Sequence, residues 1–252
     1  MIGFLEQLFN IKYPKRKMKL KEIVTFYKLA KKRKNSEKDY IAFQEFQAKK
    51  VIGQIKKYIN PAGKLILDIG CGRGGYTKKF QDYGGRVISL DREMPPVMAA
   101  FKAFVQGDAT KLPFKDNTFD LVFSSSLIEH LPKPQLLLNE VKRVMKKDAI
   151  FYLSFPPFYS PVGGHQFKPF NVFLPEKAAT FFSRKLYGIR SYRYNDIYGK
   201  LQLMTIRKAK KLIKQSSLSI IAIKTRFLNL NLAGIPFLNE LLTWHVEFFL
   251  KK

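Results

Sequence analysis

The feature that most constrains the fold is a short apolar segment that runs directly into a cluster of glycines. Residues 64–69 read Lys-Leu-Ile-Leu-Asp-Ile, and Gly70, Gly72, Gly74 and Gly75 follow. Glycine tolerates left-handed backbone dihedrals and lets a ligand approach the main chain, and a helix that begins after such a turn offers free N–H groups. A strand, a tight turn and a helix in this order predict a ligand-binding turn of an α/β protein.

Apolar strands and helices alternate along the chain on both sides of this turn. Strands are expected at 64–69, 86–90, 104–106, 119–124, 149–155 and 219–224, and helices at 40–59, 75–83, 95–102, 135–145 and 205–215. Apolar runs such as Leu121-Val122-Phe123 suit strands that are buried on both faces. The alternation predicts an α/β fold with a mostly parallel sheet and helices on both of its faces. Residues 244–250 fit a last strand, which we favour, or the end of a helix from Pro236.

The chain divides into four expected regions. Residues 1–39 form a basic N-terminal extension that contains helical stretches, and residues 40–155 form the core. Residues 156–204 break the alternation with Pro-Pro, Gly-Gly and many aromatic side chains, which favours an insertion or lid after the fifth strand. Residues 205–252 return to the core.

An acidic residue two positions before the first glycine bears on the ligand. Gly70, Gly72 and Gly75 satisfy the dinucleotide fingerprint G-x-G-x-x-G, so an NAD-dependent oxidoreductase is one alternative. Asp68 argues against it, because a carboxylate at this place repels a pyrophosphate and attracts a ligand that carries an ammonium group.

With Asp68, Gly70, Gly72 and Gly74, the sequence resembles class I S-adenosylmethionine-dependent methyltransferases, whose first motif is acid-x-Gly-x-Gly-x-Gly. The runs at 112–120 and 127–131 are similar to those of the type 11 small-molecule group of this family. The resemblance covers about residues 40–155. It implies a Rossmann-like fold, S-adenosyl-L-methionine as the cofactor and methyl transfer as the reaction.

The resemblance also implies cofactor contacts at the carboxyl ends of successive strands, where ligands bind in open α/β sheets. It places Asp91 on the two ribose hydroxyls and Asp108 on the adenine amino group, in addition to Asp68 and the three glycines of the motif. Ala109 and Ser125 complete the expected cofactor contacts.

Two histidines are candidates to assist the methyl acceptor. His165, on the glycine-rich part of the expected lid, is preferred as the proton acceptor, and His130, after the fourth strand, is the second choice. Each also fits a structural role, and Glu129 fits an orienting role for His130 or a helix cap. The three histidines are far apart in sequence and the chain has one cysteine, so we expect no metal site.

The formal net charge is +27, with most of the excess in residues 1–40 and 176–252. Such a charge attracts anionic partners, among them nucleic acid, anionic lipid headgroups and lipid-linked phosphates. We favour a small or lipid-linked methyl acceptor, of glycan or isoprenoid type, that is reached at an anionic surface. RNA held by the basic flanks is the alternative acceptor, and a non-catalytic binding protein is a further alternative.

The sequence also bears on where the protein works. A membrane-spanning helix needs roughly 18 or more consecutive apolar residues. No apolar stretch of this chain reaches that length. The N-terminus is apolar first and basic second, the reverse of a secretory signal. We therefore expect a cytoplasmic protein, with peripheral association at the inner membrane surface as an option.

Overall fold

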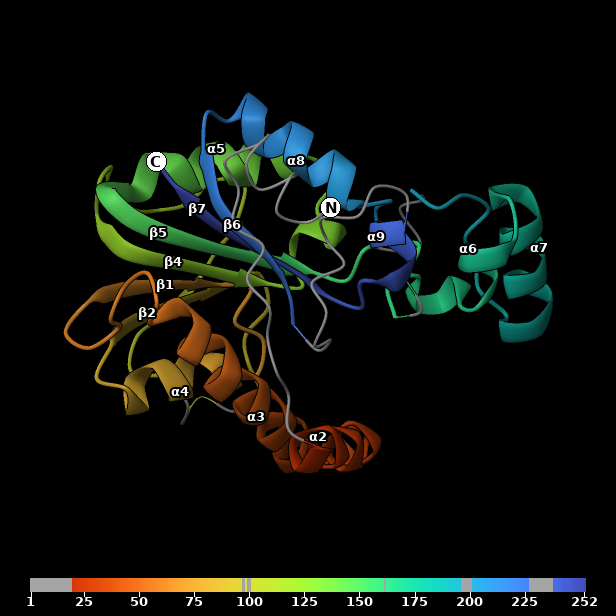
Figure 1. The fold of residues 1–252 in the computed structure, drawn as a ribbon, viewed down its shortest axis with the longest axis horizontal. Coiled ribbons are helices and arrows are strands. Elements are labelled where there is room, and N and C mark those ends of the chain that lie inside the picture. The colour runs from red at the N-terminus through yellow and green to blue at the C-terminus, as the bar shows by residue number, and fades with distance from the viewer. Residues whose placement is uncertain (1–19, 97, 99–100, 161, 196–200, 227–237) are drawn as a thin grey trace. The chain divides into compact units, whose positions relative to one another are not determined.

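A computed structural model describes residues 20–96, 98, 101–160, 162–195, 201–226 and 238–252 (Figure 1). The strands are β1 (Leu65–Ile69), β2 (Arg86–Asp91), β3 (Phe104–Gln106), β4 (Phe119–Ser125), β5 (Met145–Phe155), β6 (Ser219–Thr225) and β7 (Val246–Lys251). The α-helices are α2 (Leu20–Lys32), α3 (Glu37–Ile55), α4 (Gly75–Asp82), α5 (Pro134–Val144), α6 (Phe170–Phe173), α7 (Glu176–Tyr187), α8 (Ile206–Gln215) and α9 (Leu238–Leu242). Two short 3-10 helices, η2 (Ile128–His130) and η3 (His165–Phe167), complete the described elements. Within these ranges, no helix combines the length and the apolarity that crossing a membrane requires.

The strands form one seven-stranded sheet in the order β3-β2-β1-β4-β5-β7-β6. Strand β1 pairs in parallel with both β2 and β4, and β2 pairs in parallel with β3. The chain order reverses beside β1, because β2 and β3 extend the sheet on one side and β4 on the other. In open α/β sheets, ligands bind at the carboxyl ends of the strands at this reversal point. The glycine cluster directly follows β1 and therefore stands at that position.

The chain forms two compact units, which we describe separately. The first unit consists of the described residues within Ser126–Leu138 and Leu153–Phe249. The second unit consists of the described residues within 20–125, Asn139–Tyr152 and Leu250–Lys252.

The second unit is built around stacked aromatic side chains on the central strands. Phe123 of β4 stacks on Tyr152 of β5, with ring centroids 5.0 Å apart and planes 4° from parallel. Two side chains of α4, Tyr76 and Phe80, pack on the Phe123 ring with centroids at 4.9 and 5.2 Å. These contacts fix α4, the helix that begins at the glycine cluster, against the strands (Figure 1).

The first unit has a separate aromatic core formed by the segment after β5. Phe158, Phe167 and Tyr194 are buried together, and the Phe158 and Tyr194 rings have centroids 4.5 Å apart. Arg226, directly after β6, forms a buried ion pair with Glu247 of β7, with Nε and Oε1 at 3.1 Å. Its guanidinium also donates to Ser154 at 2.5 Å. The described residues of the expected insertion at 156–204 thus include a packed aromatic core.

The predicted fold class is confirmed, and so is the last strand, which β7 forms. Three details differ from the sequence-based prediction. Helix α3 begins at Glu37 instead of residue 40, because Ser36 caps it by accepting a hydrogen bond from the Asp39 N–H at 3.1 Å, and it ends at Ile55 instead of residue 59. Strand β5 begins at Met145, four residues before the predicted start. The predicted helix at 95–102 lies partly outside the described residues, and the described residues 95, 96, 101 and 102 are not helical.

Candidate functional site

The turn after β1 requires glycine at three positions. Gly70, Gly72 and Gly74 have φ values of 74°, 53° and 78°. These positive values lie in the left-handed region that residues with a side chain rarely adopt. The Gly70 N–H donates to the Leu90 carbonyl at 2.7 Å and fastens the turn to β2. The left-handed backbone of the turn therefore explains why all three motif positions are glycine.

Asp91 is the last residue of β2, and its carboxylate faces this turn. Its Oδ2 accepts a hydrogen bond from the Gly72 N–H at 2.8 Å, and its Oδ1 accepts from the Glu93 N–H at 3.2 Å. The structure thus brings together two predicted cofactor residues, Asp91 at the end of β2 and Gly72 in the turn after β1. A carboxylate held by main-chain donors in this way is oriented to accept hydrogen bonds from a diol such as ribose.

Asp68 lies under the turn, on β1, and is 1% exposed. Its Oδ2 accepts a hydrogen bond from the Thr77 hydroxyl at 2.6 Å, and the Thr77 and Ser89 hydroxyls lie 2.9 Å apart. Burial raises the pKa of Asp68 to about 7, the nearby Asp91 charge adds to the rise, and the Thr77 hydrogen bond opposes it. A cationic ligand group would stabilise the ionised form of this buried carboxyl.

The remaining predicted cofactor residues lie at the ends of β3 and β4. Asp108 is exposed after β3, and its Oδ1 accepts from both the N–H and the hydroxyl of Thr110 at 2.7 Å, contacts that lower its pKa. The neighbouring Ala109 is buried. Ser125 is the last residue of β4, and the parallel register pairs the preceding Ser124 with Ile69, so the ends of β4 and β1 coincide. The role of each residue toward the cofactor stays a prediction.

Helix α3 holds the glycine turn from outside, which the sequence reasoning did not foresee. Arg73 of the turn forms an ion pair with Glu37 and stacks over the Tyr40 ring, with its guanidinium carbon 4.3 Å from the centroid. The Gly75 N–H donates to the Gln44 side-chain oxygen at 3.3 Å. A Cβ on Gly75 would lie 2.4 Å from the Gln44 Cβ, so Gly75 serves helix packing. The Ser36 to Asp39 capping pattern is the sequence signal that could have placed the start of α3 at Glu37.

These contacts also bear on the dinucleotide alternative. Pyrophosphate-binding turns offer free N–H groups at the helix N-terminus. Here the Gly72 N–H is bonded to the Asp91 carboxylate and the Gly75 N–H to Gln44. Both acceptors compete with a phosphate for these donors, so the turn disfavours a pyrophosphate.

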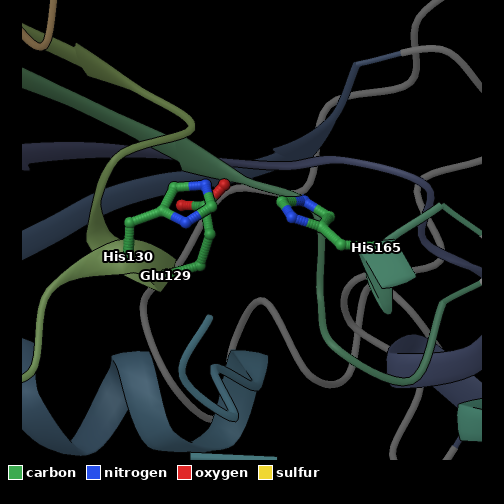
Figure 2. Close-up of side chains that lie close together, drawn as sticks. All are labelled: Glu129, His130 and His165. Carbon is green, nitrogen blue, oxygen red and sulfur yellow. The ribbon is translucent and has the colours of Figure 1, made fainter. Parts of the chain in front are cut away.

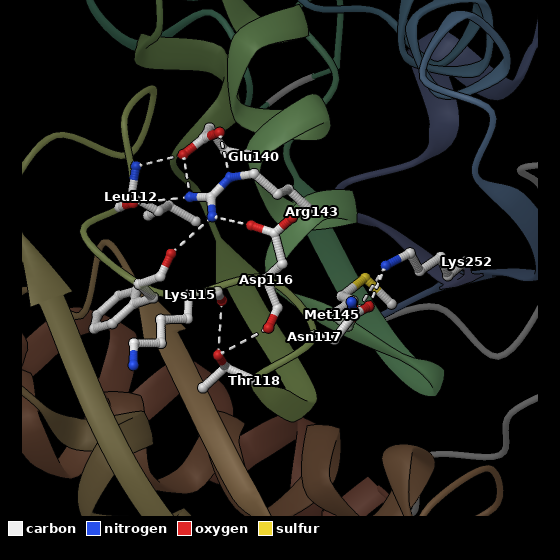
Figure 3. Close-up of polar contacts among 10 residues, drawn as sticks. Leu112, Lys115, Asp116, Asn117, Thr118, Glu140, Arg143, Met145 and Lys252 are labelled. Atoms are coloured by element: carbon white, nitrogen blue, oxygen red, sulfur yellow. Dashed lines mark hydrogen bonds and ion pairs between the residues drawn. The ribbon is translucent and has the colours of Figure 1, made fainter.

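The run at 112–118 is ordered by one arginine of α5, as Figure 3 shows. The Arg143 guanidinium donates to the carbonyls of Leu112 at 2.9 Å and Phe114 at 2.7 Å, to Asp116 Oδ1 at 2.7 Å, and to both oxygens of Glu140. These contacts raise the pKa of Arg143, so the group stays a cation. This run is one of those that resemble the type 11 group, and in this chain it has a structural role.

Two histidines and a glutamate gather in the first unit. Figure 2 shows the His165 ring turned toward the His130 ring and the Glu129 carboxylate. The two imidazole centroids lie 5.2 Å apart, and one ligand atom from each of the three residues lies within 4.8 Å of the others. His130 and His165 are far apart in the sequence, which argued against a metal site, but the fold brings them close together.

The electrostatics of this cluster follow from its burial. Burial raises the pKa of Glu129 to about 8, against the opposing effects of its own N–H and the Arg226 charge. Burial lowers the pKa of His165 to about 4, and the charges of His130 and Lys168 lower it further. His165 is thus a neutral imidazole at neutral pH, with a lone pair available to a proton or a metal ion.

The single cysteine lies inside the glycine turn but takes no evident chemical part. Cys71 is buried and has a free thiol, and burial raises its pKa, which keeps it protonated. A protonated, buried thiol is a poor nucleophile and a good packing group.

Comparisons with known proteins agree with this geometry. The family described as "Methyltransferase domain" matches residues 67–153. An uncharacterized methyltransferase of Mycobacterium leprae is 34% identical over 146 residues, which are 55% of this chain and 53% of that protein. An uncharacterized methyltransferase of Mycobacterium tuberculosis is 32% identical over 132 residues, which are 50% of this chain and 52% of that protein. The chain spans about half the length of the curated relatives it matches.

Solved structures show the same fold. A methyltransferase from Mesorhizobium loti that depends on S-adenosylmethionine superimposes with a TM-score of 0.55 at 15% identity, over 79% of this chain and 96% of that one. A protein from Thermotoga maritima, described as a possible histamine N-methyltransferase, gives 0.55 at 14% identity over 90% and 99%. Residues 67–153 of the present chain thus match a methyltransferase domain, and the solved structures share the fold of methyltransferases that depend on S-adenosylmethionine.

Proposed function

We propose that this chain uses its methyltransferase domain to methylate a small or lipid-linked acceptor, of glycan or isoprenoid type, at an anionic membrane surface. The observation that carries the proposal is the exposed face of α7. Lys177, Phe181 and Lys185 are spaced four residues apart, so they lie along one stripe of the helix. All three are exposed, whereas Ala179, Thr180 and Ser183 on the opposite face are buried.

The residues around this stripe add apolar surface. Phe181 is 49% exposed and its ring packs edge-on against Phe182, with centroids 5.4 Å apart. Leu186 and Tyr187 at the end of α7 and Phe173 at the end of α6 are also exposed. A helix face that combines lysines with aromatic side chains is typical of interfacial membrane binding. We call Lys177, Phe181, Phe182, Lys185 and Leu186 the α7 surface.

The estimated free energies favour reversible binding of the α7 surface to a membrane. A Lys or Arg near an anionic leaflet contributes about 1 kcal/mol, and burial of an apolar side chain about 1.5–3 kcal/mol when the side chain starts fully exposed. Two lysines and a half-exposed phenylalanine therefore give a few kcal/mol before the entropy of association is subtracted. The net charge of +27 adds long-range attraction to the same surface.

The proposed chemistry at the acceptor is an in-line attack of its oxygen or nitrogen on the activated methyl group, with exclusion of water. The methyl–sulfur bond would break as the new bond forms, and S-adenosylhomocysteine would leave as a neutral thioether. A hydroxyl or ammonium acceptor must lose a proton. His165, and as the second choice His130, would accept it, and the buried Glu129 would orient the imidazoles.

Flotation with vesicles tests the surface. The full chain should float with phosphatidylglycerol vesicles and much less with phosphatidylcholine vesicles, and high salt should release it. Phe181→Ser should weaken flotation about fivefold to tenfold, and Lys177→Gln with Lys185→Gln more, whereas Leu136→Ser, at a similarly exposed leucine of α5, should not. Equal flotation of all variants would contradict the α7 surface.

The acceptor class needs a separate experiment. Labelled S-adenosylmethionine, incubated with the protein and with lipid, glycan and RNA extracts in parallel, should label the lipid or glycan fraction. Label in the RNA fraction that nuclease removes would favour the alternative acceptor instead.

A further inference from the structure

Glu129, His130 and His165 come from two places in the chain. Glu129 and His130 end the short helix η2, four and five residues after β4, and His165 begins η3 in the segment after β5. Their potential ligand atoms lie within 4.8 Å of one another, and in Figure 2 the His165 ring faces the other two side chains. We refer to these residues as the Glu-His-His cluster.

The buried carboxylate of Glu129 in this cluster is not fully compensated by the described residues around it. Glu129 is 1% exposed, and no other residue in the described part of the chain gives either carboxylate oxygen a hydrogen bond. Arg226 is the cation that acts on it, but the Arg226 guanidinium is bonded to Glu247 and Ser154. A buried carboxyl group without partners is costly, and a bound cation is one way to compensate it.

The position of His165 is imposed by tight backbone packing. His165 has a positive φ of 43°, which is unusual for a residue with a side chain. The two preceding glycines fix this conformation: a Cβ on Gly163 would lie 1.8 Å from the Pro157 carbonyl oxygen, and one on Gly164 would lie 2.2 Å from the Asn171 Cγ. Asn171 in turn donates to the Phe158 carbonyl at 2.6 Å, so the aromatic core holds His165 in place.

We propose that the Glu-His-His cluster binds one divalent transition-metal ion, with Zn²⁺ as the best match. Two imidazole nitrogens and one carboxylate oxygen form a ligand set that zinc and its neighbours in the first transition row prefer. A three-ligand site leaves at least one coordination position for water or an acceptor atom.

The geometry needs only a small adjustment. Ligands bound at about 2.1 Å in a tetrahedral site lie about 3.4 Å from one another. The present separations of up to 4.8 Å therefore have to shorten by about 1.4 Å, within the range of side-chain rotation. The charge of Lys168, which acts on His165, opposes any cation. Two of the three ligands are imidazoles, so the site should favour a transition-metal ion over Mg²⁺ or Ca²⁺, which prefer oxygen ligands.

This inference competes with the role of the histidines as proton acceptors. An imidazole nitrogen that ligates a metal ion cannot accept a proton at the same time. The metal site does not depend on the proposed acceptor, and the two ideas can fail independently.

Metal titration of the full chain tests the site. After chelator treatment and its removal, the protein should bind one equivalent of Zn²⁺ by calorimetry, and Co²⁺ should give the visible absorption of a site with nitrogen and oxygen ligands. Glu129→Gln and His165→Asn should each weaken Zn²⁺ binding at least tenfold, and asparagine tolerates the left-handed backbone at 165. Glu93→Gln, at an exposed carboxylate, is the control and should bind as the unaltered chain does.

Binding of S-adenosylhomocysteine, measured on the same samples, separates folding from ligation. Variants that bind the nucleoside normally but have lost Zn²⁺ support the metal site. Unaltered protein that binds the nucleoside but takes up no more Zn²⁺ than His165→Asn overturns it. Unaltered protein that binds Zn²⁺ but not the nucleoside leaves the metal site standing and contradicts the proposed methyltransferase function.

Discussion

The side-chain oxygen of Gln44 accepts a hydrogen bond from the Gly75 N–H, so α3 closes the N-terminus of α4 beside the glycine turn. Any residue other than glycine at position 75 would clash with α3, because its Cβ would lie 2.4 Å from the Gln44 Cβ. The close packing of α3 on the glycine turn therefore requires glycine at this position.

Gly75→Ala should separate α3 from α4. We expect a loss of roughly 2 kcal/mol or more in the free energy of unfolding, since overpacking in a tight contact costs about 1–3 kcal/mol. Gly53→Ala is the matched control, because Gly53 is helical and its Cβ would meet nothing within 4 Å, so this variant should gain about 0.5–1 kcal/mol. Urea unfolding of both variants measures the contrast, and a neutral Gly75→Ala would contradict the packing role.

Asp91→Asn should weaken cofactor binding. The variant keeps an acceptor for the Gly72 N–H but loses a charged acceptor for the ribose hydroxyls, which corresponds to about 1–3 kcal/mol or roughly 5-fold to 150-fold in the dissociation constant. Calorimetry with S-adenosylhomocysteine measures this. Asp82→Asn, at the exposed end of α4, should leave the affinity unchanged. Identical affinities of the two variants would argue against the ribose contact.

Asp68→Asn should change how stability depends on pH. The folded-state pKa of Asp68, about 7, lies above the ordinary value of 3.8, so its favourable contribution is complete below pH 4 and is lost as the pH rises through 7. Relative to the unaltered chain, the variant should therefore gain stability over this window, up to about 4 kcal/mol. Urea unfolding between pH 4.5 and 8 tests the prediction. Asp108→Asn should show the opposite sign, because the pKa of Asp108 is lowered.

Arg143→Ala should destabilise the run at 112–118. It removes the donor for two backbone carbonyls and two carboxylates at once, and we expect a loss of about 2–4 kcal/mol in the free energy of unfolding. Lys147 is an exposed lysine of β5. Lys147→Ala should therefore cost no more than about 0.5 kcal/mol, as is usual for surface substitutions. Thermal unfolding of the pair provides the measurement, and equal midpoints would contradict the structural role of Arg143.

Much of the core could be predicted because its signals are local. The strand that ends in Asp68-Ile69, the positive φ values of the glycines and the acid at the end of β2 each follow from a few neighbouring residues. The bounds of α3 were less accurate, because apolar periodicity placed the start near Tyr40 while the Ser36 cap sets it at Glu37.

Contacts between distant segments could not be predicted. Gln44 and Gly75 are 31 positions apart, and His130 meets His165 only because the glycines at 163 and 164 permit a close backbone approach. Neither pairing leaves a periodic or motif-like trace in a single sequence. The same holds for Arg226 and Glu247, which meet through the pairing of the last strands.

The burial of Asp68 couples cofactor binding to proton release into the buffer. Near pH 7 this carboxyl is partly protonated and partly ionised, and binding of an ammonium group favours the ionised form. Each loading event thus expels a fraction of a proton, and the apparent heat of association should vary with the ionisation enthalpy of whichever buffer collects it.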